Sequence, residues 1–244
     1  MLPNCELVNC FGTQYLVFKG NDLISNHIRN QGYEIEVYAL AHKLLEKHED
    51  GVVLDVGANL GSFTVPLAKN NQRLTFHAFE PQRIIYYQLC ANTFINGLDN
   101  VHCHHFGLSN RRDVFMLEMP DYANETNIGA FSIDPDVRKN DYECVTVGRK
   151  EAMTVFPLDE GEHRNVRLMK IDVEGHELEV IKGAKKTIKD NNYPPIIFEA
   201  WNWKPWFEPK RQELFKYLRN MGYQLTDGGN NQLAQHPNFG DILA

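Results

Sequence analysis

A short apolar run that leads directly into a glycine turn constrains this chain more than any other feature. Residues 52–56 read Val-Val-Leu-Asp-Val, and Gly57 and Gly61 follow within the next five positions. A β-branched run of this length suits a strand that is buried on both faces, as in a parallel sheet. Glycines let the backbone turn sharply and approach a ligand closely. Because ligands of open α/β sheets lie beyond the carboxyl ends of the strands, the sequence predicts a ligand cradle at residues 55–61.

Further apolar runs alternate with helical patterns along the chain. Strands are expected at 74–79, 101–106, 167–171 and 196–198, and helices at 34–48, 62–69, 83–94 and 177–189. This alternation indicates βαβ units, in which a mostly parallel sheet has helices on both faces. We therefore predict an α/β fold and a single domain over residues 1–244.

Three segments lie outside that alternation. Residues 1–50 are expected to form a helical lead-in, because apolar residues recur at helical spacing in 34–48. Residues 110–150 hold strand-like runs at 114–119 and 143–147 around a polar stretch, which we interpret as an insertion or lid near the active site. The end of the chain is typical of a closing hairpin.

Composition and charge narrow the class of protein. The chain is 43% hydrophobic, enough for a two-sided core, and its net charge is −7. An acidic chain is a poor match for a phosphate backbone, so nucleic acid is an unlikely partner. The five cysteines are an odd number without a Cys-x-x-Cys pair, which favours reduced thiols. With no signal peptide and no apolar run of about 20 residues, we expect a cytoplasmic protein without a membrane span.

The turn after residues 52–56 indicates which ligand the cradle holds. Its pattern, Gly-Ala-Asn-Leu-Gly, is neither the dinucleotide fingerprint nor a phosphate loop. Glu80 lies 25 positions after Asp55, near the offset of roughly 20 at which an acidic residue binds a ribose diol. Alone, Glu80 is equally well explained as an acidic start of a helix. Together, these features favour a nucleoside ligand held by Asp55, Gly57, Asn59, Gly61 and Glu80.

Acidic side chains follow the strand predicted at 167–171. Carboxyl ends of neighbouring parallel strands meet at one edge of the sheet, where a substrate lies. A histidine or carboxylate at that edge can remove a proton from an acceptor. The alternative interpretation is structural, with helix capping and complementation of the helix dipole. The residues in question are Asp172, Glu174, His176 and Glu177, with Glu199 at the end of the next strand.

Two other clusters have functional and structural interpretations. Three tryptophans after Glu199 could line a site for a sugar or aromatic substrate, or they could pack the closing helix against the sheet. A run of histidines in the strand predicted at 101–106 suggests a metal. Because adjacent strand residues point to opposite faces, at most two of these three histidines share a side. We predict no metal site. The residues are Trp201, Trp203 and Trp206, and His102, His104 and His105.

Taken together, the motifs resemble the FkbM-type methyltransferases, a branch of the class I fold. The resemblance runs from about residue 25 to 225. The most specific motif is Lys-Ile-Asp-Val-Glu-Gly-His-Glu at 170–177. Further matches are 53–63, 78–81, Asn92, 96–97, 100–101, 127–132 and 181–184.

The resemblance implies a seven-stranded Rossmann-like sheet with an antiparallel final strand, and S-adenosyl-L-methionine as cofactor. It implies that the cradle residues contact this cofactor, together with Asp172 and with Ser109 in the turn that would receive the adenine ring. Asn127 and Ser132 fall in a loop that looks like the family's active-site cover. Tyr33-Glu34 resembles an element placed before the first helix.

The implied reaction is O-methylation of a hydroxyl on a sugar, glycan or other small metabolite. In that reaction Asp172 and Glu174 would orient the acceptor and the methyl donor, and His176 or Glu199 would be the base. Three alternatives remain: an RNA-directed methyltransferase, a non-catalytic cofactor-binding protein, and an NAD-linked oxidoreductase. The missing middle glycine argues against the last.

Overall fold

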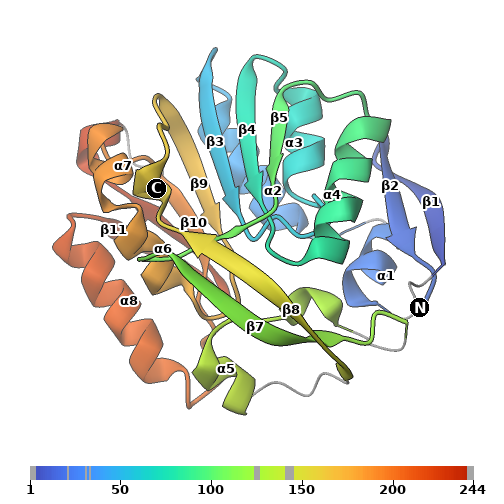
Figure 1. The fold of residues 1–244 in the computed structure, drawn as a ribbon. Helices are drawn as coiled ribbons and strands as arrows, with labels where there is room; N and C mark the ends of the chain where they lie inside the picture. Colours follow the sequence, from blue (N-terminus) through green and yellow to red (C-terminus); the bar gives the residue numbers. More distant parts are fainter. Residues whose placement is uncertain are drawn as a thin grey trace.

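A seven-stranded sheet forms the centre of the molecule (Figure 1). The computed structural model describes residues 4–20, 22–30, 32, 34–123, 127–140 and 146–240. The strand order is β11-β12-β10-β9-β3-β4-β5. Strands β5, β4, β3, β9 and β10 run parallel, and β12 lies antiparallel to both β10 and β11. The predicted sheet of about seven mostly parallel strands, closed by a hairpin, is confirmed. The strands are β3 (Gly51–Val56), β4 (Leu74–Phe79), β5 (Val101–His104), β9 (Val166–Ile171), β10 (Ile196–Glu199), β11 (Gln224–Gly228) and β12 (Asn231–Gln235).

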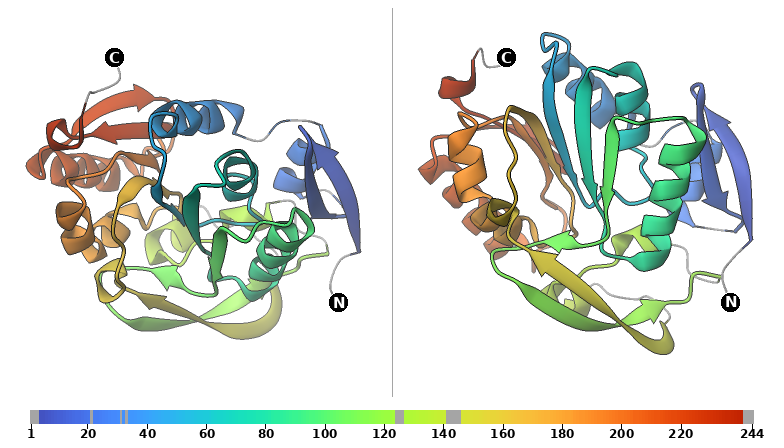
Figure 2. Two further views of the ribbon diagram at one scale, coloured as in Figure 1. Left: turned by 90° about the horizontal axis from the view of Figure 1, so that it is seen from above. Right: turned by 45° about the horizontal axis from the view of Figure 1, so that its top comes forward.

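Helices cover both faces of this sheet, as the two views of Figure 2 show. Adjacent residues of β3 point to opposite faces, so Val53 and Leu54 belong to two different cores. The core around Val53 is closed by α2 and α3, and the core around Leu54 by α6, α7 and α8. The helices are α2 (Ile35–Leu45), α3 (Thr64–Asn70), α4 (Arg83–Ile95), α6 (Glu177–Gly183), α7 (Lys185–Asp190) and α8 (Glu208–Asn220).

Several elements differ from the prediction in their bounds, and the helix expected at 34–48 ends at Leu45. The helix expected at 177–189 is divided at Ala184 into α6 and α7. At the end of α6, a Cβ on Gly183 would lie 1.9 Å from the carbonyl oxygen of Ser109, so the backbones are in close contact there. The strand expected at 101–106 ends at His104.

The N-terminal segment is not helical throughout, which corrects the predicted lead-in over residues 1–50. β1 (Cys5–Cys10) and β2 (Thr13–Phe18) form a hairpin before α1 (Leu23–Arg29) and α2. Gly12, with φ at 78°, makes the turn. Asn92 on α4 fastens the hairpin, because its Oδ1 accepts a hydrogen bond from Leu16 N at 2.6 Å.

The segment expected to be an insertion builds a second sheet and a cover. β7 (Asp113–Pro120) and β8 (Thr146–Phe156) form a long antiparallel ribbon, and β6 (Gly107–Leu108) pairs with β8. In Figure 1 this ribbon crosses beneath the main sheet. Of the strand expected at 143–147, residues 143–145 lie outside the described residues. Between β7 and β8, residues 127–140 carry a short 3-10 turn (Ile128–Ala130) and α5 (Pro135–Asn140); we call residues 127–140 the cover.

Cys10, Cys90 and Cys103 are free thiols, and Cys144 lies outside the described residues. Within the described ranges, no helix combines the length and the apolarity that crossing a bilayer requires.

Candidate active site

A cavity of about 510 Å³ opens at the carboxyl edge of the main sheet. Its walls come from the turn after β3, the segment after β4, the ends of β9 and β10, and the cover. Leu23 and Ile24 of α1 complete one side. The volume falls within the range of about 300–1,000 Å³ that is typical of small-molecule sites. The predicted cradle and the predicted acidic edge therefore face one common space.

The turn after β3 is held rigidly against β4 and β9. The backbone N–H groups of Gly57 and Ala58 both donate to the carbonyl of Phe79, each at 3.0 Å. A Cβ on Gly57 would lie 1.8 Å from the carbonyl oxygen of Asp172, and Gly57 has φ at 84°. Only glycine fits that position. Gly57 and Asn59 line the cavity, as the sequence predicts.

Asp55 and Gly61 support the turn instead of lining the cavity. The Asp55 carboxylate is fully buried and accepts a hydrogen bond from Thr64 Oγ1 at 2.5 Å. Gly61 faces the side chains of Val65 and Leu89. Neither residue is therefore placed to contact a ligand in the cavity, although the sequence analysis expects both to do so.

Glu80 is buried at the inner end of the cavity. Its Oε2 accepts a hydrogen bond from Asn59 N at 3.0 Å, and its Oε1 accepts one from Gln82 N at 2.7 Å. Burial raises the pKa of this carboxyl group to about 7. Each carboxylate oxygen has two acceptor sites, so each has one left for a ligand hydroxyl. The geometry suits a pair of neighbouring hydroxyls.

The loop between β9 and α6 is fixed by hydrogen bonds from three directions. Asp172 N donates to the carbonyl of Val56 at 2.9 Å. Glu177 Oε1 accepts from the backbone N–H groups of Val173 and Gly175 at 3.2 and 3.1 Å. From the cover, Ser132 Oγ donates to the carbonyl of Glu174 at 2.6 Å. Glu177 is thus a structural residue of the loop, and Ser132 connects the cover to it.

Three carboxylates converge where this loop meets the end of β10. One carboxylate oxygen from each of Asp172, Glu174 and Glu199 lies within 4.8 Å of the other two. We call these residues the carboxylate triad. All three line the cavity. The pKa of Glu199 is raised well above its usual value, first by burial and then by the neighbouring charge of Asp172.

A buried lysine lies beside the triad. Lys170 Nζ is 3.0 Å from Asp172 Oδ2 and 3.8 Å from Glu34 Oε2. Burial raises the pKa of Glu34 to about 7, although Lys170 opposes the shift. Glu34 therefore lies near the site, while Tyr33 is outside the described residues. Lys170 was not predicted as a site residue, yet it lies two positions before Asp172 on a strand and so points the same way.

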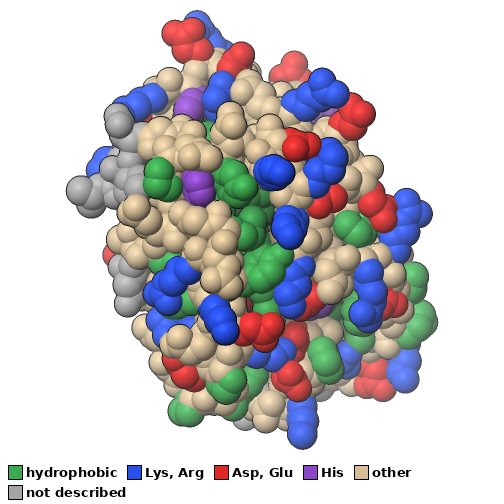
Figure 3. All heavy atoms as spheres, turned by 90° about the vertical axis from the view of Figure 1, so that its left-hand side faces the viewer, with side chains coloured by type: hydrophobic (Ala, Val, Ile, Leu, Met, Phe, Trp, Pro, Cys, Tyr) green, Lys and Arg blue, Asp and Glu red, His purple; other side chains and the backbone are tan. Residues whose placement is uncertain are grey.

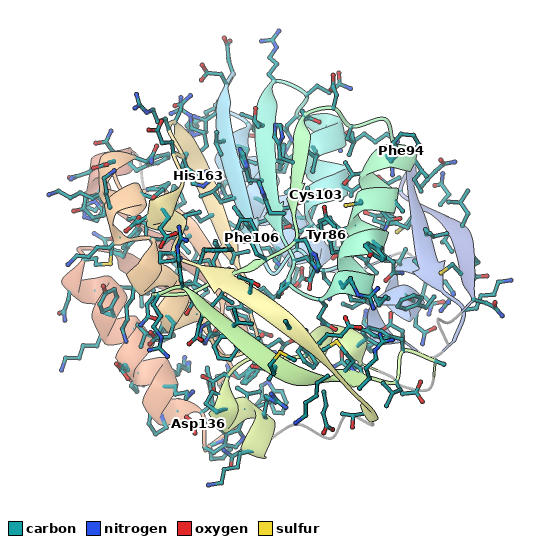
Figure 4. The ribbon with its side chains drawn as sticks, in the orientation of Figure 1. Tyr86, Phe94, Cys103, Phe106, Asp136 and His163 are labelled. Carbon is teal, nitrogen blue, oxygen red and sulfur yellow. The ribbon has the colours of Figure 1, made fainter. Side chains whose placement is uncertain are left out.

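Two further predicted residues, Ser109 and His176, lie away from the cavity walls. His176 Nε2 and Ser109 Oγ are hydrogen-bonded to each other at 2.9 Å, and both residues are buried. From the segment expected to hold an adenine ring, Gly107 and Leu108 line the cavity. Phe106, labelled in Figure 4, packs against Phe156 with the ring centroids 5.1 Å apart.

Tryptophans contribute to the wall of the cavity. Trp201 and Trp203 line it, while Trp206 packs against Trp201 and Phe207. Lys204 Nζ lies 3.6 Å from the ring centroid of Trp201 and 4.6 Å from that of Trp203. Trp203 is 61% exposed, so its ring is available at the mouth. Trp201 and Trp203 therefore fit the interpretation as site residues, and Trp206 fits the interpretation as a packing residue.

The histidines of β5 are placed as the strand alternation predicts. His102 and His104 both stack on His77 of β4, with the centroids 5.0 and 5.2 Å apart. His105 stacks on Tyr86 instead.

A family profile and several curated proteins match this chain. A family profile described as "Methyltransferase FkbM domain" matches residues 55–225. Methyltransferase 1 of Beauveria bassiana is 28% identical over 149 residues, covering 55% of this chain and 59% of that protein. Hexuronic acid methyltransferase AglP of Haloferax volcanii is 28% identical over 162 residues, covering 64% of this chain and 59% of AglP. The matched part of the chain thus spans about three fifths of the length of each of these relatives.

A solved structure has the same fold. Precorrin-6y C5,15-methyltransferase from Geobacter metallireducens superposes with a TM-score of 0.50 at 14% identity, covering 82% of this chain and 88% of that one. At such low identity the similarity concerns the fold alone.

Proposed function

Because this chain belongs to the FkbM methyltransferase family, we propose that it transfers a methyl group from S-adenosylmethionine to a hydroxyl of a sugar, glycan or other small metabolite. The resemblance seen in the sequence is confirmed by the family profile. The observation that carries the proposal is the meeting of the buried Glu80 carboxylate and the carboxylate triad in one cavity. One end suits a nucleoside, and the other suits an acceptor hydroxyl.

The residues at the inner end fit the cofactor. Gly57 and Asn59 bring the backbone close to the cavity, and Glu80 offers acceptor sites to the two ribose hydroxyls. When bound, S-adenosylmethionine supplies a methyl group made electrophilic by its sulfonium.

The carboxylate triad positions the acceptor. Asp172 and Glu174 accept hydrogen bonds from acceptor hydroxyls, and their backbone is fixed by the contacts to Val56 and Ser132. Holding the reacting oxygen at a near-attack distance of about 3–3.5 Å is itself a large part of catalysis. Glu199 is the proton acceptor, because its raised pKa makes it a stronger base than an ordinary carboxylate. We prefer it to His176, which is hydrogen-bonded to Ser109 away from the cavity walls.

A carbohydrate is the favoured acceptor class. Trp203 presents an exposed indole at the mouth, and indoles combine an apolar face with a polar edge. The relative AglP is named as a hexuronic acid methyltransferase, which supports the same class.

An RNA acceptor is disfavoured by charge. The chain carries a net charge of −7, and the triad adds negative charge where a phosphate backbone would approach. On the face shown in Figure 3, basic and acidic side chains are intermixed. The free thiols of Cys10, Cys90 and Cys103 support the proposal of a cytoplasmic location.

The experiment is a methyl-transfer screen. Wild-type protein is incubated with methyl-labelled S-adenosylmethionine and a panel of monosaccharides, uronic acids, oligosaccharides and RNA. We expect label on a sugar hydroxyl. With that acceptor, Asp172→Asn should lower turnover by about 100-fold or more while cofactor affinity changes by less than about threefold. The matched control is Glu162→Gln, whose side chain is 87% exposed.

Three results would count against this assignment. Intact turnover in Asp172→Asn would remove the triad from the mechanism. Label on RNA alone would favour the RNA-directed alternative. Cofactor binding without transfer to any acceptor would favour a non-catalytic protein.

A further inference from the structure

We propose that Asp172, Glu174 and Glu199 together bind a divalent cation of the hard, oxygen-seeking class, such as Mg²⁺ or Mn²⁺. The inference rests on the proposed function, because the cation would lie where the acceptor hydroxyl is expected. It adds a metal ion to the proposed site, in addition to S-adenosylmethionine.

The spacing of the triad fits one cation. Its three ligand oxygens all lie within 4.8 Å of one another. Neighbouring oxygens around one cation lie about 3 Å apart for Mg²⁺ and about 3.3–3.7 Å apart for Ca²⁺. The three oxygens are therefore near enough to converge on one cation after small rotations of the side chains. Ligand sets made only of carboxylate oxygens suit cations of this class.

A buried oxygen without a partner provides the second observation. Glu199 Oε2 is buried and, within the described part of the chain, accepts no hydrogen bond. Glu199 lines the cavity, so this carboxylate faces the same space as the other two. Buried polar atoms are rarely left unsatisfied, and an ion is one accepted explanation.

The charges around Glu199 point the same way. Lys170 forms a 3.0 Å ion pair with Asp172. Three carboxylates this close together repel one another when they are ionised, and a divalent cation bound between them would offset that repulsion.

The cation would leave coordination positions open toward the cavity. An acceptor hydroxyl bound at such a position would become more acidic, as water does on a metal ion. One oxygen of Glu199 would bind the cation, and the other would accept the hydroxyl proton. The bound cation would make Glu199 a weaker base, and the greater acidity of the bound hydroxyl would offset that change.

To test this, the protein is first stripped of metal with a chelator and then titrated with Mn²⁺ alone. Free Mn²⁺ is measured by electron paramagnetic resonance. Wild type should bind one Mn²⁺ with a dissociation constant below about 1 mM. Glu199→Gln and Asp172→Asn should each weaken this binding by at least about tenfold. Glu162→Gln, an exposed carboxylate outside the site, should bind Mn²⁺ like wild type. Thermal unfolding of each variant verifies that it is folded.

The same samples are titrated calorimetrically with S-adenosylmethionine, which separates this inference from the proposed function. Wild type that binds the cofactor but no Mn²⁺ up to about 10 mM would overturn the cation site and leave methyl transfer standing. Unchanged Mn²⁺ affinity in both triad variants would also overturn the site. If the wild-type protein did not bind S-adenosylmethionine, the proposed function would be contradicted, whatever the Mn²⁺ result.

Discussion

Among single residues, Glu80 has the clearest chemical consequence. Its carboxyl group is 5% exposed, and burial raises its pKa to about 7. Ribose hydroxyls donate to the ionised form, whose two oxygens are both acceptors. Cofactor affinity should therefore rise as the pH increases from 6 to 8, because the carboxylate fraction increases over that range.

Glu80→Gln isolates this effect. The variant lacks the charge and keeps the size, so it should bind S-adenosylmethionine about 10- to 100-fold more weakly, as expected for lost hydrogen bonds to a charged group. Its affinity should also be nearly independent of pH. Calorimetry at pH 6, 7 and 8 measures both effects. An unchanged pH dependence in the variant would show that another group controls it.

The sequence predicts that several of these residues lie at one edge of the sheet, and the reasons are local. Gly57, Asn59 and Glu80 follow parallel strands, and such strands end at one edge. Asp172, Glu174 and Glu199 obey the same rule. The direction in which a side chain points from a loop cannot be predicted from this rule. Glu174 adopts a left-handed backbone with φ at 53°, and two positions later His176 is directed to Ser109.

Between elements, the link from the cover to the loop after β9 is the contact with the clearest prediction. Ser132 is fully buried; its Oγ donates to the carbonyl of Glu174 and accepts from Asp134 N at 3.0 Å. Ser132→Ala should lower the free energy of unfolding by about 1–2 kcal/mol. It should also reduce methyl transfer more than cofactor affinity, because the loop carrying Glu174 is loosened.

Thr93→Val on α4 is the matched control, since it removes another buried hydroxyl, which contacts Cys103 Sγ. Denaturant unfolding and the transfer assay are run on both variants. Equal loss of transfer in the two variants would mean that the effect of Ser132 is general destabilisation and not positioning.

Most elements follow from periodicity, and the exceptions have physical causes. β4 agrees with its predicted bounds because four of its six residues are apolar and buried, namely Leu74, Phe76, Ala78 and Phe79. The β1–β2 hairpin was missed because it lies at the edge of the fold and its outer strand is half exposed. Its order depends on distant contacts from Asn92 and Asn96 of the α4 region, which the hairpin's own sequence does not reveal.

At the scale of the whole molecule, a histidine pair between β4 and β5 links stability to pH. His77 Nδ1 and His104 Nε2 lie 2.9 Å apart, and His163, labelled in Figure 4, packs edge-on against His77. Burial lowers the pKa of His77 and of His104 to about 4, from about 6.5 in an unfolded chain. The folded state therefore binds fewer protons between these values. The stability contribution is complete above about pH 6.5 and is lost as the pH falls toward 4.

His104→Phe should reduce this loss, because phenylalanine keeps the stacking on Phe79 and does not titrate. Between pH 7 and 4.5, wild type should lose on the order of 1 kcal/mol more unfolding free energy than the variant. Denaturant titrations at both pH values provide the measurement, with His42→Phe on the exposed face of α2 as control. Parallel pH profiles for wild type and His104→Phe would contradict the assignment.

The central claim is that the cavity at the edge of the main sheet holds S-adenosylmethionine. Calorimetric titration of the wild-type protein with S-adenosylmethionine and, separately, with NAD tests it most directly. The account predicts dissociation constants in the micromolar range for S-adenosylmethionine, about −8 kcal/mol, and no measurable binding of NAD. Tight binding of NAD with no binding of S-adenosylmethionine would contradict it.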